Sequence, residues 1–131
     1  ATRLLYVMVV EDCSIYQKAR LGGFLPYRNP DDPPRKLLRA LEVETGKIIW
    51  EIPQVGTPDS NYSGVLSTDG GLVFYGETGG GFAAVEATTG KTLWHFEANQ
   101  IWKGLPITHA VKGKHVAIAS GGNLLAFALP D

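Results

Sequence analysis

The chain has 131 residues, of which 44% are hydrophobic and 19% are charged, and its formal net charge is −1. This length suits one domain with a substantial core, and this composition excludes a disordered chain. A near-neutral charge gives no reason to expect nucleic acid or acidic lipid as a partner, and no apolar run is long enough to predict a membrane span.

The first predicted strand covers residues 4–10, and the abrupt start on a strand suggests that the chain was cut from a longer protein. Cys13 is the one cysteine, so we expect a small buried hydrophobic residue rather than an internal disulfide. Residues 12–36 form a Pro- and Gly-rich insertion that we expect to be too irregular for a strand. Such an insertion covers one rim of the domain, forms a pocket wall, or is disordered.

Short strands separated by glycine turns are predicted along the rest of the chain. No stretch between residues 63 and 98 has a helical period, so the prediction is all-β. The strands fall into three groups of three, four and three. The remaining strands of the first group are residues 36–44 and 47–53; the second group is 63–68, 71–78, 81–87 and 91–98, and the third is 105–111, 114–120 and 123–130.

One motif occurs twice in the chain. The eleven residues ALEVETGKIIW, starting at Ala40, return as AVEATTGKTLW, 44 positions later, and six of the eleven are identical. Four-stranded units at this period are typical of propeller blades. We therefore predict an all-β partial β-propeller of about two and a half four-stranded antiparallel blades. In the single domain 1–131, the first blade is partial (1–53, with the insertion), the second is complete (63–98) and the third is partial (104–131).

The repeated motif is predicted to join neighbouring blades. Its glycine supplies the positive φ of a tight hairpin turn, and its alanine is small because another element packs against it. Its tryptophan, on an outer strand, is predicted to stack near the turn glycine of an adjacent blade. The predicted docking residues are therefore Ala40, Gly46, Trp50, Ala84, Gly90 and Trp94.

The motif A-x-E-x-x-T-G-K-x-x-W resembles the tryptophan-docking motif of the pyrroloquinoline quinone (PQQ) dependent dehydrogenases. Residues 4–20 and 101–131 also resemble the C-terminal part of the propeller in the alcohol dehydrogenase branch. The resemblance covers nearly the whole chain, and it implies an eight-bladed periplasmic propeller that oxidises alcohols or sugars. The partners of this piece are then the N-terminal blades of the same chain. Alone, it is expected to be inert and to self-associate through two open blade faces.

Members of this family bind PQQ on the propeller axis, with Ca²⁺ beside it and an Asp as the catalytic base. The resemblance places the base and the metal ligands in earlier blades, so no catalytic or metal residue is assigned here. Two segments, 61–68 and 99–106, resemble the family's approaches to the quinone. A tricarboxylated quinone needs flat aromatic contact and cationic partners. The expected cofactor-binding residues are Asn61, Tyr62, Trp102 and Lys103.

Other interpretations stay open at this point. Tyr62, where the methanol-oxidising members have Trp, and Trp102 are alternatively core residues between blades, and Lys103 is alternatively solvated. The whole protein is alternatively a non-catalytic propeller scaffold for protein interaction or envelope assembly, or a sugar- or polymer-binding propeller. The glycines at 76–81 indicate a hairpin turn rather than an anion site, and the three histidines have no partners at zinc-ligand spacing.

Overall fold

The computed structural model describes residues 2–55, 63–110, 112, 114–120 and 123–128. Within these ranges the chain forms the antiparallel strands β1 to β12 and no helix, which confirms the all-β prediction. Accordingly, the described part offers no helical segment of the length and hydrophobicity that a bilayer crossing requires.

The middle of the chain forms one four-stranded sheet in sequential order, as expected for residues 63–98. Each strand is shorter than its predicted range, because the residues at its ends belong to the turns. The strands are β6 (Val65–Ser67), β7 (Leu72–Gly76), β8 (Phe82–Glu86) and β9 (Thr92–Phe96).

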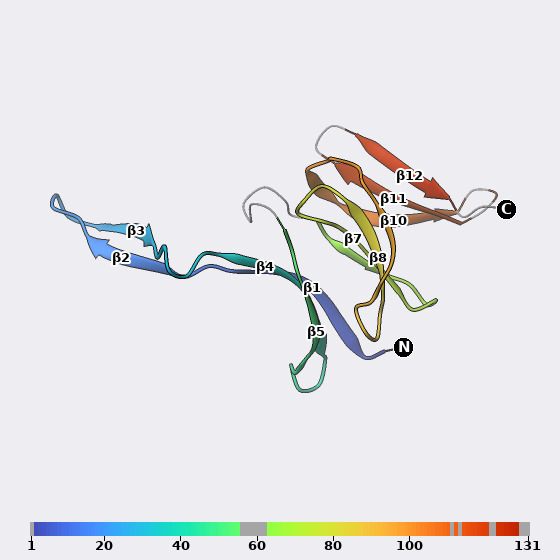
Figure 1. Ribbon diagram of the computed structural model, residues 1–131, viewed down its shortest axis with the longest axis horizontal. Coiled ribbons are helices and arrows are strands. Elements are labelled where there is room, and N and C mark those ends of the chain that lie inside the picture. The colour runs from blue at the N-terminus through green and yellow to red at the C-terminus, as the bar shows by residue number, and fades with distance from the viewer. Residues whose placement is uncertain (1, 56–62, 111, 113, 121–122, 129–131) are drawn as a thin grey trace.

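Two three-stranded sheets flank this central sheet (Figure 1). The first has the order β1-β4-β5 and the third has the order β10-β11-β12. All six strands match predicted ones. Their bounds are β1 (Leu4–Glu11), β4 (Arg35–Glu42), β5 (Ile48–Pro53), β10 (Trp102–Ala110), β11 (Lys114–Ser120) and β12 (Leu124–Ala128).

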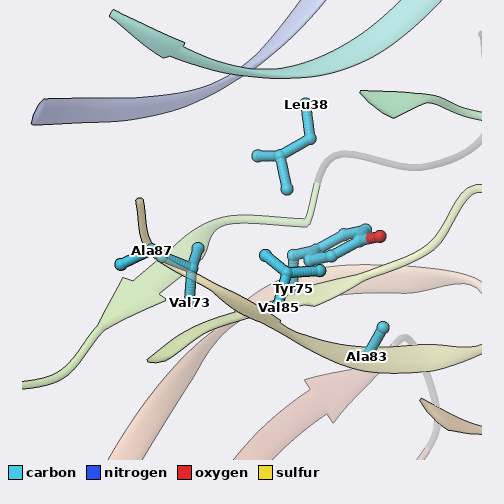
Figure 2. Packing of buried hydrophobic residues seen from close by; sticks show 6 residues of the cluster. All are labelled: Leu38, Val73, Tyr75, Ala83, Val85 and Ala87. Carbon is cyan, nitrogen blue, oxygen red and sulfur yellow. The ribbon is translucent and has the colours of Figure 1, made fainter. Parts of the chain in front are cut away.

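The central sheet is covered on both faces. Leu38 of the first sheet lies over the face that carries Val73, Tyr75 and Val85 (Figure 2). On the other face, Phe82 packs with Trp102 of the third sheet. Residues 82–85 of β8 are therefore all buried, which explains why this strand is a continuous apolar run without polar alternation.

The identical residues of the repeated motif form the turn that follows β4 and the turn that follows β8. In the first copy, Gly46 N donates to Glu42 O at 2.8 Å, and the Thr45 hydroxyl donates to the Glu42 carboxylate and accepts from Lys47 N. The second copy repeats these bonds at Glu86, Thr89, Gly90 and Lys91. The motif alanine pairs with the motif tryptophan in both copies, directly before a bulge. Four of the six identities, Glu, Thr, Gly and Lys, are thus requirements of a local turn.

The indole of Trp50, on β5 of the first sheet, contacts the turn between β8 and β9 of the central sheet. Its Nε1 donates to Ala87 O at 3.0 Å, and the Tyr6 hydroxyl donates to the same oxygen at 3.1 Å. A Cβ on Gly90 would lie 2.8 Å from the indole ring. The structure therefore brings Trp50 and Gly90 together, and only glycine permits this close approach.

Trp94 has different surroundings from Trp50. It is 38% exposed, and its ring meets Phe127 of the third sheet edge-on at a centroid distance of 5.2 Å. Gly46 has a positive φ close to that of Gly90, 70° against 73°, but a Cβ there would meet nothing within 4 Å. In the described ranges, the stacking of an indole on a turn glycine is thus seen at Trp50 and not at Trp94.

The insertion forms a β-hairpin, β2 (Ser14–Lys18) and β3 (Phe24–Arg28). The expectation that residues 12–36 contain no strand is wrong. Gly22 and Gly23, with φ of 93° and 84°, form the turn that joins the two strands and do not mark an irregular segment. Pro26 is compatible with β3 because a strand of a two-stranded ribbon has one edge that needs no hydrogen-bond donor.

Within the described chain, the hairpin covers none of the three sheets and projects away from them (Figure 1). Cys13, at its root, is exposed, so the expectation of a buried cysteine is wrong. The physical reason is that a two-stranded ribbon has no second layer against which a small apolar side chain could pack.

A cluster of charges ties the hairpin root to the outer strand of the first sheet. Arg39 binds the Glu11 carboxylate and, through Nε, the Glu51 carboxylate at 2.7 Å, and Arg35 also binds Glu11. The Arg39 hydrogen bond, opposed by partial desolvation and assisted by the charges of both arginines, lowers the pKa of Glu11 below its ordinary 4.5. Glu11 thus favours the folded state in its ionised form.

Replacing each motif glycine by alanine separates backbone strain from the indole contact. In the chain of residues 1–131, Gly46→Ala should lower the free energy of unfolding only by the left-handed backbone strain, about 1 kcal/mol, because nothing lies within 4 Å of a Cβ there. Gly90→Ala should cost about 2 to 4 kcal/mol, because its Cβ also collides with Trp50. Denaturant unfolding of the two variants measures the difference. Equal losses would show that the Trp50 ring does not require glycine beneath it.

The Glu11 cluster predicts a specific acid sensitivity. Because the folded pKa is depressed, its stabilisation is present above the unfolded pKa of about 4.5 and is lost as pH falls through the folded value. Glu11→Gln should therefore flatten the fall in unfolding free energy below about pH 5, measured by denaturant titrations. Asp69→Asn, which removes an exposed carboxylate in a turn of the central sheet, is the matched control, and equal flattening in both variants would contradict the role of the Glu11 cluster.

Candidate functional site

The linkers between sheets and the insertion leave the sheets at the same rim. Leu37, near the start of β4, pairs with Pro53, at the end of β5. Phe82, at the start of β8, pairs with Phe96, at the end of β9. The hairpin, the linker after β5 and the linker after β9 therefore begin at one side of the molecule, which we call the linker rim.

The two segments expected to approach a cofactor converge at the linker rim. Gly64 N, just before β6, donates to Gly104 O in β10 at 3.5 Å. A Cβ on Gly64 would lie 1.8 Å from the Leu105 side chain, so the two first strands of neighbouring sheets touch here. This convergence is the geometry that a site on a central axis requires.

Ser63 fixes the start of the central sheet at this rim. It is buried, its Oγ accepts from Gly76 N at 2.9 Å, and its hydroxyl donates to Gly64 O at 3.0 Å. Asn61 and Tyr62 directly precede it and lie outside the described residues. Their predicted contact with a cofactor therefore stays a prediction.

Trp102 is enclosed between the central and third sheets. It is fully buried, its Nε1 donates to Gly81 O at 2.7 Å, and its ring centroid lies 5.8 Å from that of Phe82. A Cβ on Gly76 would lie 2.4 Å from the ring. This placement fits the alternative of a core residue between blades. The segment around Trp102 therefore presents its backbone and the next side chain to the linker rim.

Lys103 is that next side chain, and it is exposed. No ion pair of Lys103 occurs in the part of the chain that the structure describes. An exposed ammonium beside a fixed backbone segment can bind a carboxylate through a charge-assisted hydrogen bond. Of the described candidates, Lys103 is the one available to a ligand.

Two small cavities open at the linker rim, and sequence reasoning missed both. One, of about 230 Å³, lies between the start of β4 and the end of β5, and the other, of about 150 Å³, lies between the first and central sheets. Pro53 and Gln54 line both cavities. The first is otherwise lined by Pro34, Arg35, Lys36, Leu37 and Glu51, and the second by Ile52, Val55, Tyr75, Glu77 and Gly79.

Two titratable groups at these cavities have shifted pKa values. Burial lowers the pKa of Lys36, which is only 5% exposed. Burial, assisted by the charge of Glu77 and opposed by a hydrogen bond with Gln54, raises the pKa of Tyr75 to about 12. Tyr75 therefore stays neutral at physiological pH and serves as a fixed hydrogen-bonding wall.

Two glutamines tie the linkers to the next sheet, and the sequence interpretation missed them. Gln54 Nε2 donates to Ile52 O, and its Oε1 accepts from Thr78 N at 3.3 Å. Gln100 Nε2 donates to Ala98 O, and its Oε1 accepts from Asn123 Nδ2 at 3.2 Å. Gln54 lies four residues after its motif tryptophan and Gln100 lies six after, so no fixed spacing revealed the repeat.

The described residues contain no group of three or more His, Cys, Asp or Glu side chains that could hold a metal ion. The histidine at 95, without a partner at ligand spacing in the sequence, does meet a carboxylate in space. Its Nε2 lies 2.7 Å from Glu77 Oε2 and 3.9 Å from Glu97 Oε2. A single histidine beside two glutamates, one in the turn after β7 and one just after β9, falls short of a metal site in this part of the chain.

Comparisons with known proteins identify the family. The family model described as outer membrane protein assembly factor BamB matches residues 34–130. Quinoprotein alcohol dehydrogenase PedE of Pseudomonas putida KT2440 is 38% identical over 112 residues, covering 79% of this chain and 16% of the relative. Quinoprotein ethanol dehydrogenase of Pseudomonas aeruginosa PAO1 is 37% identical over 112 residues, covering 79% and 17%. The chain thus spans about a sixth of the length of these relatives.

Solved structures show the same fold. A quinohemoprotein alcohol dehydrogenase from Pseudomonas putida HK5 matches with a TM-score of 0.78 at 23% identity, covering 94% of this chain and 21% of the other. BamB from Moraxella catarrhalis matches with a TM-score of 0.53 at 18% identity, covering 80% and 34%. The prediction of a partial propeller is confirmed. The chain belongs to the PQQ-type propeller family described by the assembly factor BamB, and it is a propeller piece like those of the quinoprotein alcohol dehydrogenases.

Proposed function

We propose that the full-length protein is a quinoprotein oxidoreductase that oxidises alcohols or sugars with PQQ and calcium, and that this segment alone is inert. Similarity to quinoprotein alcohol dehydrogenases over 79% of the chain supports the reaction class. The observation that carries the proposal is the meeting of β6 and β10 at the linker rim, where Gly64 contacts Gly104 and Leu105. Residues just before β6 and at the start of β10 can then reach one ligand.

The proposed cofactor contacts are Asn61, Tyr62, Lys103 and the backbone of the Trp102 segment. The Trp102 indole is held by Gly81 O, so it acts as a positioning residue that fixes where Lys103 stands. Bound PQQ would supply a two-electron acceptor for the alcohol. Lys103 would pair with one of its carboxylates, which orients the ring without taking part in the oxidation.

Calcium belongs to the proposal and has no ligand set in the described residues. Two relatives are named lanthanide-dependent methanol dehydrogenase: the protein of Methylorubrum extorquens AM1 is 42% identical over 77 residues, and that of Methylacidiphilum fumariolicum SolV is 41% identical over 78. A lanthanide is therefore the competing metal. The base and the metal ligands would come from other parts of the full-length protein.

We further propose a periplasmic location and an assembly in which other blades of the same chain cover both ends of this piece. The exposed apolar residues Leu5 on β1 and Leu124 on β12 support the covering of both ends, because water would otherwise meet these blade surfaces. The isolated piece would then self-associate through the same surfaces.

A non-catalytic propeller scaffold for protein interaction or envelope assembly is the second candidate function. The description of the matching family and the structural likeness to BamB favour it. In that case the linker rim would serve as a docking surface and would need no cofactor. The two candidates share the fold, so only a cofactor measurement separates them.

The deciding experiment reconstitutes the full-length protein with PQQ and either Ca²⁺ or La³⁺, and follows reduction of an artificial dye with a panel of alcohols and sugars. The enzyme proposal expects cofactor absorbance on the purified protein and substrate-dependent dye reduction with at least one metal. If the protein shows no cofactor absorbance and no turnover with either metal, the enzyme proposal is rejected and the scaffold remains.

Lys103→Ala should weaken PQQ binding about tenfold, because it removes one charge-assisted hydrogen bond worth about 1.5 kcal/mol. Equilibrium titration of the apoprotein with PQQ measures the effect. Lys91→Ala, an exposed lysine in the turn at the opposite rim, is the matched control and should bind PQQ as the unaltered protein does. Identical affinities for both variants would remove Lys103 from the site.

A further inference from the structure

The β2–β3 hairpin is the one part of the described chain that projects from the packed sheets (Figure 1). Every residue of both strands is exposed. A two-stranded ribbon is marginally stable in water by itself, and this one offers several large apolar side chains to solvent. Its composition therefore indicates a second surface that it meets.

The hairpin ends in an ordered turn that presents one cation and one apolar residue. Gly22 N donates to Ala19 O at 3.1 Å, which places Arg20 and Leu21 at the centre of the turn. Leu21 is 100% exposed. Immediately below the turn, Lys18 pairs across the ribbon with Phe24, which is 70% exposed. We call residues 18–25, which also include the exposed Leu25, the hairpin tip.

The hairpin concentrates positive charge that the near-neutral total of the chain hides. Residues 14–28 contain three cationic side chains and no acidic one. Arg28, at the root, pairs with Asp12 at 3.3 Å. Lys18 and Arg20, at the tip, form no ion pair within the described ranges. The root acids Asp31 and Asp32 lie at the opposite end of the ribbon, so the tip is cationic.

We propose that the hairpin tip inserts into the surface of an anionic phospholipid bilayer and anchors the protein there peripherally. Exposed Leu and Phe side chains among cations are the chemistry of interfacial anchors, which bury apolar groups at the headgroup boundary. Each cation near an anionic leaflet adds electrostatic attraction. The projection of the ribbon lets the tip reach a flat surface before the sheets do.

The distribution of apolar groups around the ribbon favours lipid over a protein groove. Cross-strand partners share a face, so Leu25 lies on the opposite face from Phe24, and Leu21 stands at the apex between them. A protein that docks on a ribbon covers one face and leaves the other in water. Lipid surrounds an inserted tip on all sides, so apolar groups on both faces are satisfied together.

The test is sedimentation of the full-length protein with vesicles of phosphatidylcholine alone or mixed with phosphatidylglycerol. Binding is expected to the anionic vesicles, and to weaken as salt is raised. Lys18→Ala and Arg20→Ala should each lower the partition coefficient about fivefold. Leu21→Ser should lower the partition coefficient about tenfold, because the substitution removes a leucine side chain that the bilayer would bury.

Matched controls are Val43→Ser and Lys47→Glu, an exposed apolar residue and an exposed cation in the turn at the opposite rim. They should bind vesicles as the unaltered protein does, and thermal unfolding should show that the exposed tip substitutions leave the fold intact. Three outcomes would each overturn the anchor. They are no binding to vesicles, equal binding to neutral and anionic vesicles, and an equal loss of vesicle binding in the tip and control variants. Tip-dependent capture by a protein without vesicle binding would likewise overturn it.

Discussion

The contact between the Trp50 indole and the Gly90 turn is the interaction on which the arrangement of the sheets depends. A sheet with two apolar faces is stable only when neighbouring layers cover both of them. The Trp50 ring and the Tyr6 hydroxyl converge on one carbonyl, Ala87 O, and this fixes the first sheet laterally on the central one. Leu38 then packs in one buried cluster with Val73 and Val85.

The joint between these sheets is held at two ends of the same strand. Trp50 lies toward one rim, and Gln54, just past the end of β5, ties the opposite rim to Thr78 of the next sheet. Two fixed points prevent the sheets from rotating about either one. The positions of the linkers are thereby set, and with them the meeting of Gly64 and Gly104 where a ligand is proposed to bind. The packing between sheets thus determines the geometry of the proposed binding site at this rim.

Much of the fold could be predicted because the repeated motif encodes local interactions. Glu42, Thr45, Gly46 and Lys47 hydrogen-bond within one turn, so their spacing is visible in the sequence and its repeat marks the strands on both sides. The features that escaped prediction depend on chain segments far apart. The burial of Trp102 is decided by Gly76 and Gly81, and the cavities by two sheets together.

The insertion departs from prediction for a different reason. Pro and Gly predict irregular structure, but a two-stranded ribbon tolerates both, since Gly22 and Gly23 form its turn. The wrong expectation of a buried Cys13 has the same origin, because a two-stranded ribbon has no interior in which a side chain could be buried. Asn61 and Tyr62 could be placed only by resemblance, since nothing in their composition separates a ligand contact from a packing contact.

The ladder between β1 and β4 runs without interruption to Glu11 and Arg35, the residues that flank the hairpin. The register of the first sheet therefore does not depend on what is inserted between those two positions. Natural variation can lengthen, shorten or exchange this ribbon while the blade beneath keeps its pairing. Adhesive or recognition peptides grafted there by design would leave the propeller sheets unchanged.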